Sequence, residues 1–296
     1  MDVRSRDYPE RARRTLDETP SVRDAVTAAT MSFDAHRREA FAELDADAFR
    51  AWAEEVKSHA LHHLDRYLEE AEARLLERGA RVHWAESAQD VHAVLEGILE
   101  GRGVRTVVKA KSMLGEELGV NAFLEAQGVE VFETDLGEYV IQLLGEPPSH
   151  IVGPAIHRSL EEIRTLFHER LGTAPDASPD VLAGAARRVL RQAFLAADLG
   201  ISGGNFLVAE TGSLALIENE GNIRLSTSLP PVHVALVGIE KVLPRWSDLA
   251  PFLQLTARAA TGQPVGTFVS IIQGPREGGR TAGEDHQSVS GPPEPD

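Results

Sequence analysis

The sequence predicts an α/β fold with a mostly parallel sheet and a helical extension at the N-terminus. Three observations lead to this fold class. Before residue 80, apolar residues follow only helical periodicity. Residues 81–133 then alternate short apolar runs with amphipathic segments, which is typical of a parallel sheet covered by helices. Three more apolar runs in the stretch 199–241 predict further buried strands.

The N-terminal part reads as a loose terminus followed by helices. Residues 1–21 are rich in Arg, Asp, Glu and Pro, so we expect them to be disordered. Apolar residues recur at steps of three and four over 22–44 and again over 47–79, which predicts a helix and then a second, long helix. Gly79 fits a C-terminal cap. Residues 22–79 therefore form the predicted helical extension.

Three histidines lie in the long predicted helix, at positions 59, 62 and 63. A metal-binding pair at this helical spacing is one interpretation. Because no second cluster of ligands accompanies them, exposed helix histidines are favoured, and we expect no metal site in the chain.

The alternating region predicts three strands, over 81–84, 106–110 and 129–133. Ser87 and Ser112 each stand where a helix would begin, and the second helix would run to about residue 127.

Further helices are expected from Ser159, from Pro179 to about residue 198, and over 246–258, with a last strand over 266–273. We assign residues 80–276 to one α/β domain and expect a disordered tail over 277–296, where no apolar pattern remains.

Polar clusters around glycine separate the strands expected at 206–209, 214–217 and 232–237. The clusters are residues 210–213 and 218–222. One interpretation is two hairpin turns, since glycine and these polar residues favour turns. The other is a ligand site at strand ends, the usual position of a site in an open α/β sheet.

The candidate site follows from the second interpretation. Lys109, Lys111 and Ser112 come directly after one strand, where a helix N-terminus and lysines would bind an anion; alternatively Ser112 only caps the helix and the lysines are solvated. Glu210 and Glu220 are the candidate catalytic groups for proton transfer. The remaining candidates would bind a small carboxylate or phosphate: Glu138, His150, His157, Asn205, Thr211, Ser213 and Asn222.

Composition excludes several functions. The net charge is −16, with 46 acidic against 30 basic residues, which argues against nucleic acid and anionic membranes as main partners. No apolar run approaches the roughly 20 residues of a membrane helix, and no signal peptide is visible, so we expect a cytoplasmic protein. With no cysteine, the chain itself offers no thiolate for zinc or an iron–sulfur cluster.

Several long motifs, in a fixed order, resemble one known family. They span about residues 22 to 276 and include Val-Lys-Ala-Lys-Ser-Met (108–113), Glu-Thr-Asp-Leu-Gly-Glu-Tyr-Val-Ile-Gln-Leu (133–143), Pro-Ser-His-Ile-Val-Gly-Pro-Ala-Ile-His (148–157), Gly-Ile-Ser-Gly-Gly-Asn-Phe (200–206), Ala-Glu-Thr-Gly-Ser (209–213) and Asn-Glu-Gly-Asn-Ile-Arg-Leu (219–225). Together they resemble the LUD domain of the lactate-utilisation proteins, and within that family the iron–sulfur (B-type) members.

The resemblance implies a Rossmann-like fold similar to sugar-phosphate isomerases and CoA-transferases. It also implies a part in the oxidation of L-lactate to pyruvate with A- and C-type partner proteins. In the family, a ferredoxin-like part with two [4Fe–4S] clusters follows the LUD domain. This sequence departs from that pattern, because it has no cysteine after its Gln-Gly-Pro-Arg at 273–276. We expect either a shortened gene product or one whose cluster-bearing half is a separate ferredoxin-like chain.

Three functions remain open at this point. The chain is a subunit of a lactate-oxidising redox complex, a stand-alone enzyme of isomerase or transferase type acting on an anionic substrate, or a non-catalytic scaffold.

Overall fold

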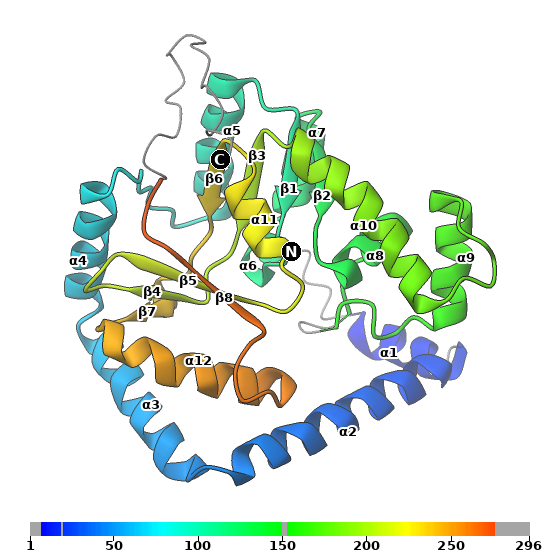
Figure 1. Ribbon diagram of the computed structural model, residues 1–296, viewed down its shortest axis with the longest axis horizontal. Helices are drawn as coiled ribbons and strands as arrows, with labels where there is room; N and C mark the ends of the chain where they lie inside the picture. The colour runs from blue at the N-terminus through cyan, green and yellow to red at the C-terminus, as the bar shows by residue number, and fades with distance from the viewer. Residues whose placement is uncertain (1–6, 19, 150–152, 276–296) are drawn as a thin grey trace, which may run out of the picture.

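The computed structural model describes residues 7–18, 20–149 and 153–275, and its strands form two four-stranded sheets (Figure 1). The first sheet has the order β2-β1-β3-β6 and is parallel throughout; its strands are β1 (Thr106–Lys109), β2 (Glu130–Glu133), β3 (Leu199–Ser202) and β6 (Val232–Ala235). This sheet confirms the predicted α/β class.

The second sheet has the order β7-β4-β5-β8. Its strands are β4 (Phe206–Val208), β5 (Ser213–Glu218), β7 (Val242–Leu243) and β8 (Phe268–Ile272). Strand β5 is antiparallel to both β4 and β8, whereas β4 is parallel to β7. The apolar runs of the central stretch are therefore divided between the two sheets.

The described helices are α1 (Tyr8–Glu18), α2 (Pro20–Ala42), α3 (Ala46–His62), α4 (Leu64–Glu77), α5 (Ala88–Arg102), α6 (Met113–Glu117), α7 (Val120–Ala126), α8 (Leu136–Leu144), α9 (Leu160–Leu171), α10 (Pro179–Ala196), α11 (Asn222–Ser228) and α12 (Trp246–Thr261), with a 3₁₀ turn at Ile239–Lys241. None of them is long and apolar enough to cross a membrane.

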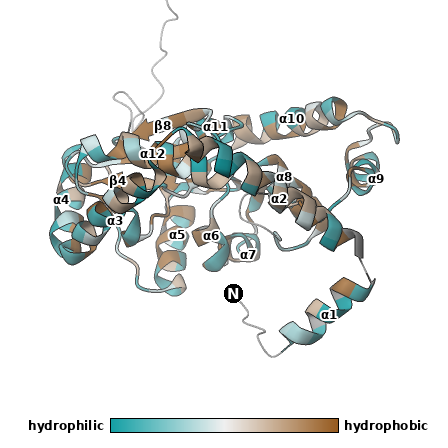
Figure 2. Ribbon diagram, turned by 90° about the horizontal axis from the view of Figure 1, so that it is seen from below, coloured by the Kyte–Doolittle hydropathy of each residue, from teal (hydrophilic) through white to brown (hydrophobic). Residues whose placement is uncertain are grey.

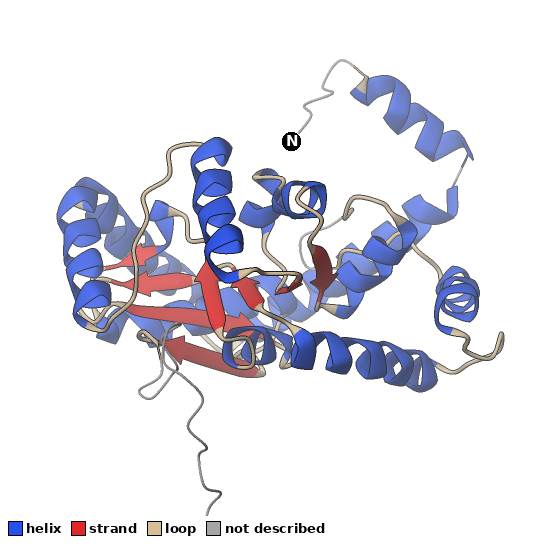
Figure 3. Cartoon of the chain, turned by 90° about the horizontal axis from the view of Figure 1, so that it is seen from above, coloured by secondary structure: helices blue, strands red, loops and turns tan. Residues whose placement is uncertain are grey.

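Helices cover both faces of the parallel sheet (Figure 3). On one face, Val107 and Leu199 pack with Leu95 of α5 and Leu124 of α7. On the other face, Val108 packs with side chains of α8, α9 and α10. The alternation of side chains along each strand directs neighbouring residues to opposite faces, so both faces of these short apolar strands are buried.

Helix α11 lies directly on β3, and Gly200 makes this contact possible. A Cβ atom at Gly200 would lie 1.8 Å from the carbonyl oxygen of Ser226 in α11. Strand β3 was not predicted from the sequence, because Gly200 interrupts a strand of four residues, Leu199–Ser202, which is too short to show a strand pattern.

The predicted helical extension covers the second sheet. Ala53 of α3 packs with Val208, Ala215 and Phe252, and Ala71 of α4 packs with the neighbouring part of the same sheet. Helix α2 contacts α12, and α1 stands apart beyond α2 (Figure 2). Helices α3 and α4 are thus packed against the second sheet, whereas α2 packs on α12.

Two expectations near the N-terminus were wrong. Residues 8–18 of the expected loose terminus form a helix. The long helix predicted over 47–79 is broken at His63 (φ −124°, ψ 33°). The helical spacing of apolar residues continues through the break, and both α3 and α4 contact β7. The bend at His63 therefore lets one apolar stripe pack along a curved surface.

Three interpretations of local structure were also wrong. Residues 81–84 form no strand, and the Trp84 indole donates to Glu72 (3.0 Å). The helix after Ser112 is divided by Gly119, which has a left-handed backbone (φ +64°). The cluster at 218–222 starts α11 and is not a hairpin turn. Residues 1–6, 150–152 and the tail from 276 lie outside the described residues.

Candidate functional site at the carboxyl edge of the parallel sheet

A buried lysine marks the carboxyl edge of the parallel sheet. Lys109 ends β1, lies beside Glu133 at the end of β2 in the strand register, and has 0% exposure. Its ammonium group is 2.8 Å from Glu133 Oε1 and 3.0 Å from Glu116 Oε1. Burial opposes the charge of Lys109, but the two carboxylates outweigh it and raise the pKa of the lysine. Lys109 is therefore charged and held in place.

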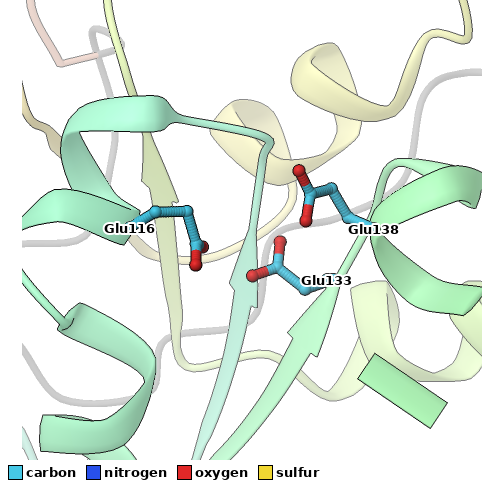
Figure 4. Close-up of side chains that lie close together, drawn as sticks. All are labelled: Glu116, Glu133 and Glu138. Atoms are coloured by element: carbon cyan, nitrogen blue, oxygen red, sulfur yellow. The ribbon is translucent and has the colours of Figure 1, made fainter. Parts of the chain in front are cut away.

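Glu138 brings a third carboxyl group to this lysine. It lies on α8 with 6% exposure, and Figure 4 shows the Glu133 carboxylate between those of Glu116 and Glu138. One oxygen from each of the three lies within 4.8 Å of the others. Burial, and then the negative charge of Glu133, raises the pKa of Glu138 to about 7. We call Glu116, Glu133 and Glu138 the carboxylate cluster.

A second polar group lies along the same edge. The Lys111 ammonium is 3.0 Å from Asp135 Oδ2, and Asp135 Oδ1 accepts a hydrogen bond from the Glu138 backbone N–H (3.2 Å) as the N-cap of α8. Glu220 accepts from the backbone N–H of Leu136 (3.1 Å). Burial and the negative charge of Asp135 raise the pKa of Glu220. Lys111, Asp135 and Glu220 thus surround the start of α8.

Hydroxyl and amide groups complete the edge. Asn222 Nδ2 donates to Thr134 Oγ1 (3.3 Å), and Ser226 lies at the same distance from that hydroxyl. Ser112 accepts from the Gly115 backbone N–H (3.2 Å) as the cap of α6. A Cβ atom at Gly203, just after β3, would lie 3.0 Å from Ser112 Oγ. The loops after β1, β2 and β3 therefore meet, as parallel strands require.

The predicted residues Lys109, Lys111, Ser112, Glu138, Glu220 and Asn222 all lie along this edge. The structure does not bring Glu210, Thr211 and Ser213 to it. Those three belong to the β4–β5 hairpin, at the opposite end of β5 from Glu218.

Each residue of that hairpin has a structural partner. Glu210 Oε2 accepts from the backbone N–H of Trp246 (2.7 Å) at the start of α12. The Thr211 and Ser213 hydroxyls are 2.7 Å apart, and Gln273 donates to Ser213 (2.8 Å). These residues therefore lie apart from the lysines at the edge of the parallel sheet, although all of them were candidates for one site.

The other predicted residues lie in connecting segments. Asn205 Oδ1 accepts from the Ile217 backbone N–H (2.8 Å) and ties the segment after β3 to β5. His157 contacts Ser149 Oγ (2.7 Å) and Glu146 Oε2 (3.3 Å) in the connection between α8 and α9. His150 lies outside the described residues.

Sequence reasoning missed three residues. Glu116 and Glu133 contact Lys109. For Glu133, the sequence signal was a charged residue at the end of an apolar strand; for Glu116 on α6 we find no such signal. His233 on β6 was also missed; its Nε2 is 2.8 Å from Ser202 Oγ on β3. Burial lowers the pKa of His233 to about 4, so it is neutral at physiological pH.

Comparison with known proteins gives the family. The LUD domain family model matches residues 68–294. Lactate utilization protein B of Shouchella clausii is 41% identical over 266 residues, which are 89% of this chain and 56% of the relative. Lactate utilization protein B of Geobacillus sp. (strain WCH70) is 38% identical over 96% of this chain and 60% of its own length.

The Escherichia coli protein named "Uncharacterized electron transport protein YkgF" is 38% identical over 94% of this chain and 59% of its own length. No solved structure matches the chain. The chain spans about three fifths of the length of these relatives. The match of the family model over residues 68–294 means that the chain belongs to the LUD domain family.

Proposed function

We propose that the chain is the LUD component of a cytoplasmic lactate-utilisation system that oxidises L-lactate to pyruvate. The proposal rests on the similarity, over about nine tenths of the chain, to relatives named for lactate utilisation. The reaction removes two electrons and two protons from lactate. Because these 296 residues contain no cysteine, we assign the electron acceptor, [4Fe–4S] clusters, to residues outside them, in a ferredoxin-like C-terminal part or on a partner chain. A- and C-type lactate-utilisation proteins complete the proposed system.

We assign the substrate carboxylate to Lys111. Its side chain is 29% exposed, and its ion pair with Asp135 keeps the ammonium at the start of α8. An incoming carboxylate would share this ammonium through a charge-assisted hydrogen bond. Glu220 also lies at the α8 start, where it accepts from the Leu136 N–H, and burial raises its pKa, so we assign it the proton of the substrate hydroxyl.

Reconstitution tests the proposal. The full chain, candidate A- and C-type proteins and a ferredoxin-like chain are combined, and L-lactate-dependent dye reduction is measured. Lys111→Ala should reduce the rate at least about tenfold while the protein stays folded, and the melting temperature should fall somewhat because the partner Asp135 is buried.

Lys241→Ala is the matched control, because this exposed lysine pairs with Glu240 in the 3₁₀ turn before β7. Full activity of Lys111→Ala would remove the site assignment. Absence of lactate-dependent reduction in every combination would remove the function itself.

A further inference from the structure

The carboxylate cluster has the dimensions of a cation site. One oxygen each from Glu116, Glu133 and Glu138 lies within 4.8 Å of the other two. In octahedral magnesium sites the metal–oxygen distance is about 2.1 Å, so ligands on opposite sides of the ion are about 4.2 Å apart and adjacent ones about 3 Å apart. Small side-chain adjustments would therefore bring all three oxygens onto one ion.

A separate observation points to a missing positive group. Glu133 is 2% exposed, and its Oε2 atom has no hydrogen-bond partner among the described residues. Its other oxygen, Oε1, contacts both Lys109 (2.8 Å) and Asn121 Nδ2 (2.6 Å). A buried carboxylate oxygen without a partner is costly, and such groups in native proteins usually bind a donor, a water or an ion.

The charges of the cluster agree with a divalent ion. When all three carboxyl groups are ionised, as they would be around a bound ion, they and the ammonium group sum to a net charge of −2, which one divalent cation would cancel. Lys109 holds the Oε1 atoms of Glu116 and Glu133 on one side, which leaves Glu133 Oε2 and the Glu138 carboxyl for another group. The Glu116 side chain is 28% exposed, so water can reach the cluster and complete a coordination shell.

We propose that Glu116, Glu133 and Glu138 bind one divalent cation of the oxygen-preferring class, Mg²⁺ or Mn²⁺. Carboxylate and water ligands without imidazole or thiolate favour these ions. Lys109 then acts as a positioning residue that fixes two of the three ligands. This inference concerns the cluster alone and holds whether or not the chain acts on lactate.

Mn²⁺ binding to the chelator-treated full chain tests this proposal, with free Mn²⁺ followed by electron paramagnetic resonance. We expect one saturable Mn²⁺ per chain, competition by Mg²⁺, and a melting temperature that rises with Mn²⁺ concentration. Glu138→Gln and Glu133→Gln should each weaken binding about tenfold or more. Glu117→Gln should bind as the wild type does, because Glu117 is exposed on the same helix and outside the cluster.

Circular dichroism checks that each variant is folded. If Glu133→Gln fails to fold, Glu138→Gln decides the question, because the ion pairs of Lys109 in the described residues are with Glu116 and Glu133 and stay in place in this variant. Absence of saturable binding by the wild type up to about millimolar Mn²⁺ would overturn the proposal. Unchanged affinity in Glu138→Gln would overturn it too, since the ion would then bind elsewhere.

Discussion

His233 should make the fold sensitive to mild acid. Burial lowers its pKa from 6.5 to about 4 in the folded chain, while the unfolded chain keeps the ordinary value. Between these two values the unfolded state binds a proton that the folded state does not. Stability contributed by neutral His233 is therefore complete above about pH 6.5 and is lost as the pH falls towards 4.

The size of the effect follows from the shift. A displacement from 6.5 to about 4 at 1.36 kcal/mol for each pKa unit corresponds to about 3 kcal/mol once the pH is below 4. Between pH 7 and pH 5 the same relation gives a loss of about 2 kcal/mol in the free energy of unfolding. Many carboxyl groups also titrate in acid, so the wild type alone does not isolate this contribution.

The comparison with His233→Gln isolates it. Glutamine retains an Nε2 that can reach Ser202 Oγ, where the histidine contact is 2.8 Å, but glutamine does not titrate. Urea unfolding of both proteins at pH 7 and pH 5 gives two differences in unfolding free energy. We expect the wild type to lose about 2 kcal/mol more than the variant over this interval. Equal losses in the two proteins would refute the reasoning that burial keeps His233 neutral.

Three further predictions concern packing, capping and the buried charge. Gly200→Ala should destabilise the fold by about 3 kcal/mol or more, since its Cβ would collide with the Ser226 carbonyl. The control Gly97→Ala, in open space on α5, should be neutral or stabilising by up to about 1 kcal/mol. Thermal melts measure both variants, and equal effects would contradict the close contact with α11. Glu210→Ala should lower the free energy of unfolding by about 1 kcal/mol, because the hydrogen bond from the Trp246 N–H is lost. The lactate-dependent activity of the reconstituted system should stay intact. A large loss of activity in a stable variant would show that Glu210 belongs to the site. Lys109→Met should lower the free energy of unfolding by about 3 to 5 kcal/mol, because it leaves two carboxylates without their ammonium partner. Urea unfolding with chelator at pH 8 measures this loss, and a loss below about 1 kcal/mol would mean that the ion pairs are not formed.

The sequence alone determined the α/β class, most elements of the parallel sheet and several helix starts. Ser87 and Ser159 form capping boxes where hydroxyl and acidic residues stand three positions apart. These features depend on neighbouring residues, so the local pattern contains them. The loop after β1, with Lys111 and Ser112, was also placed at the sheet edge by local pattern, because a strand followed by a helix fixes where the strand ends.

Only the tertiary structure decided which polar residues meet. Glu210 and Glu220 look alike in the sequence, each beside a glycine after an apolar run, yet β5 carries them to opposite ends of the second sheet. Glu116 and Glu133 are 17 positions apart, yet both contact Lys109: Glu133 because β1 and β2 pair in register, and Glu116 because α6 follows β1 directly. Strand pairing joins residues that are distant in the chain, and no local periodicity encodes the partner. The sequence therefore predicted the elements, and the pairing of strands placed the carboxylate cluster.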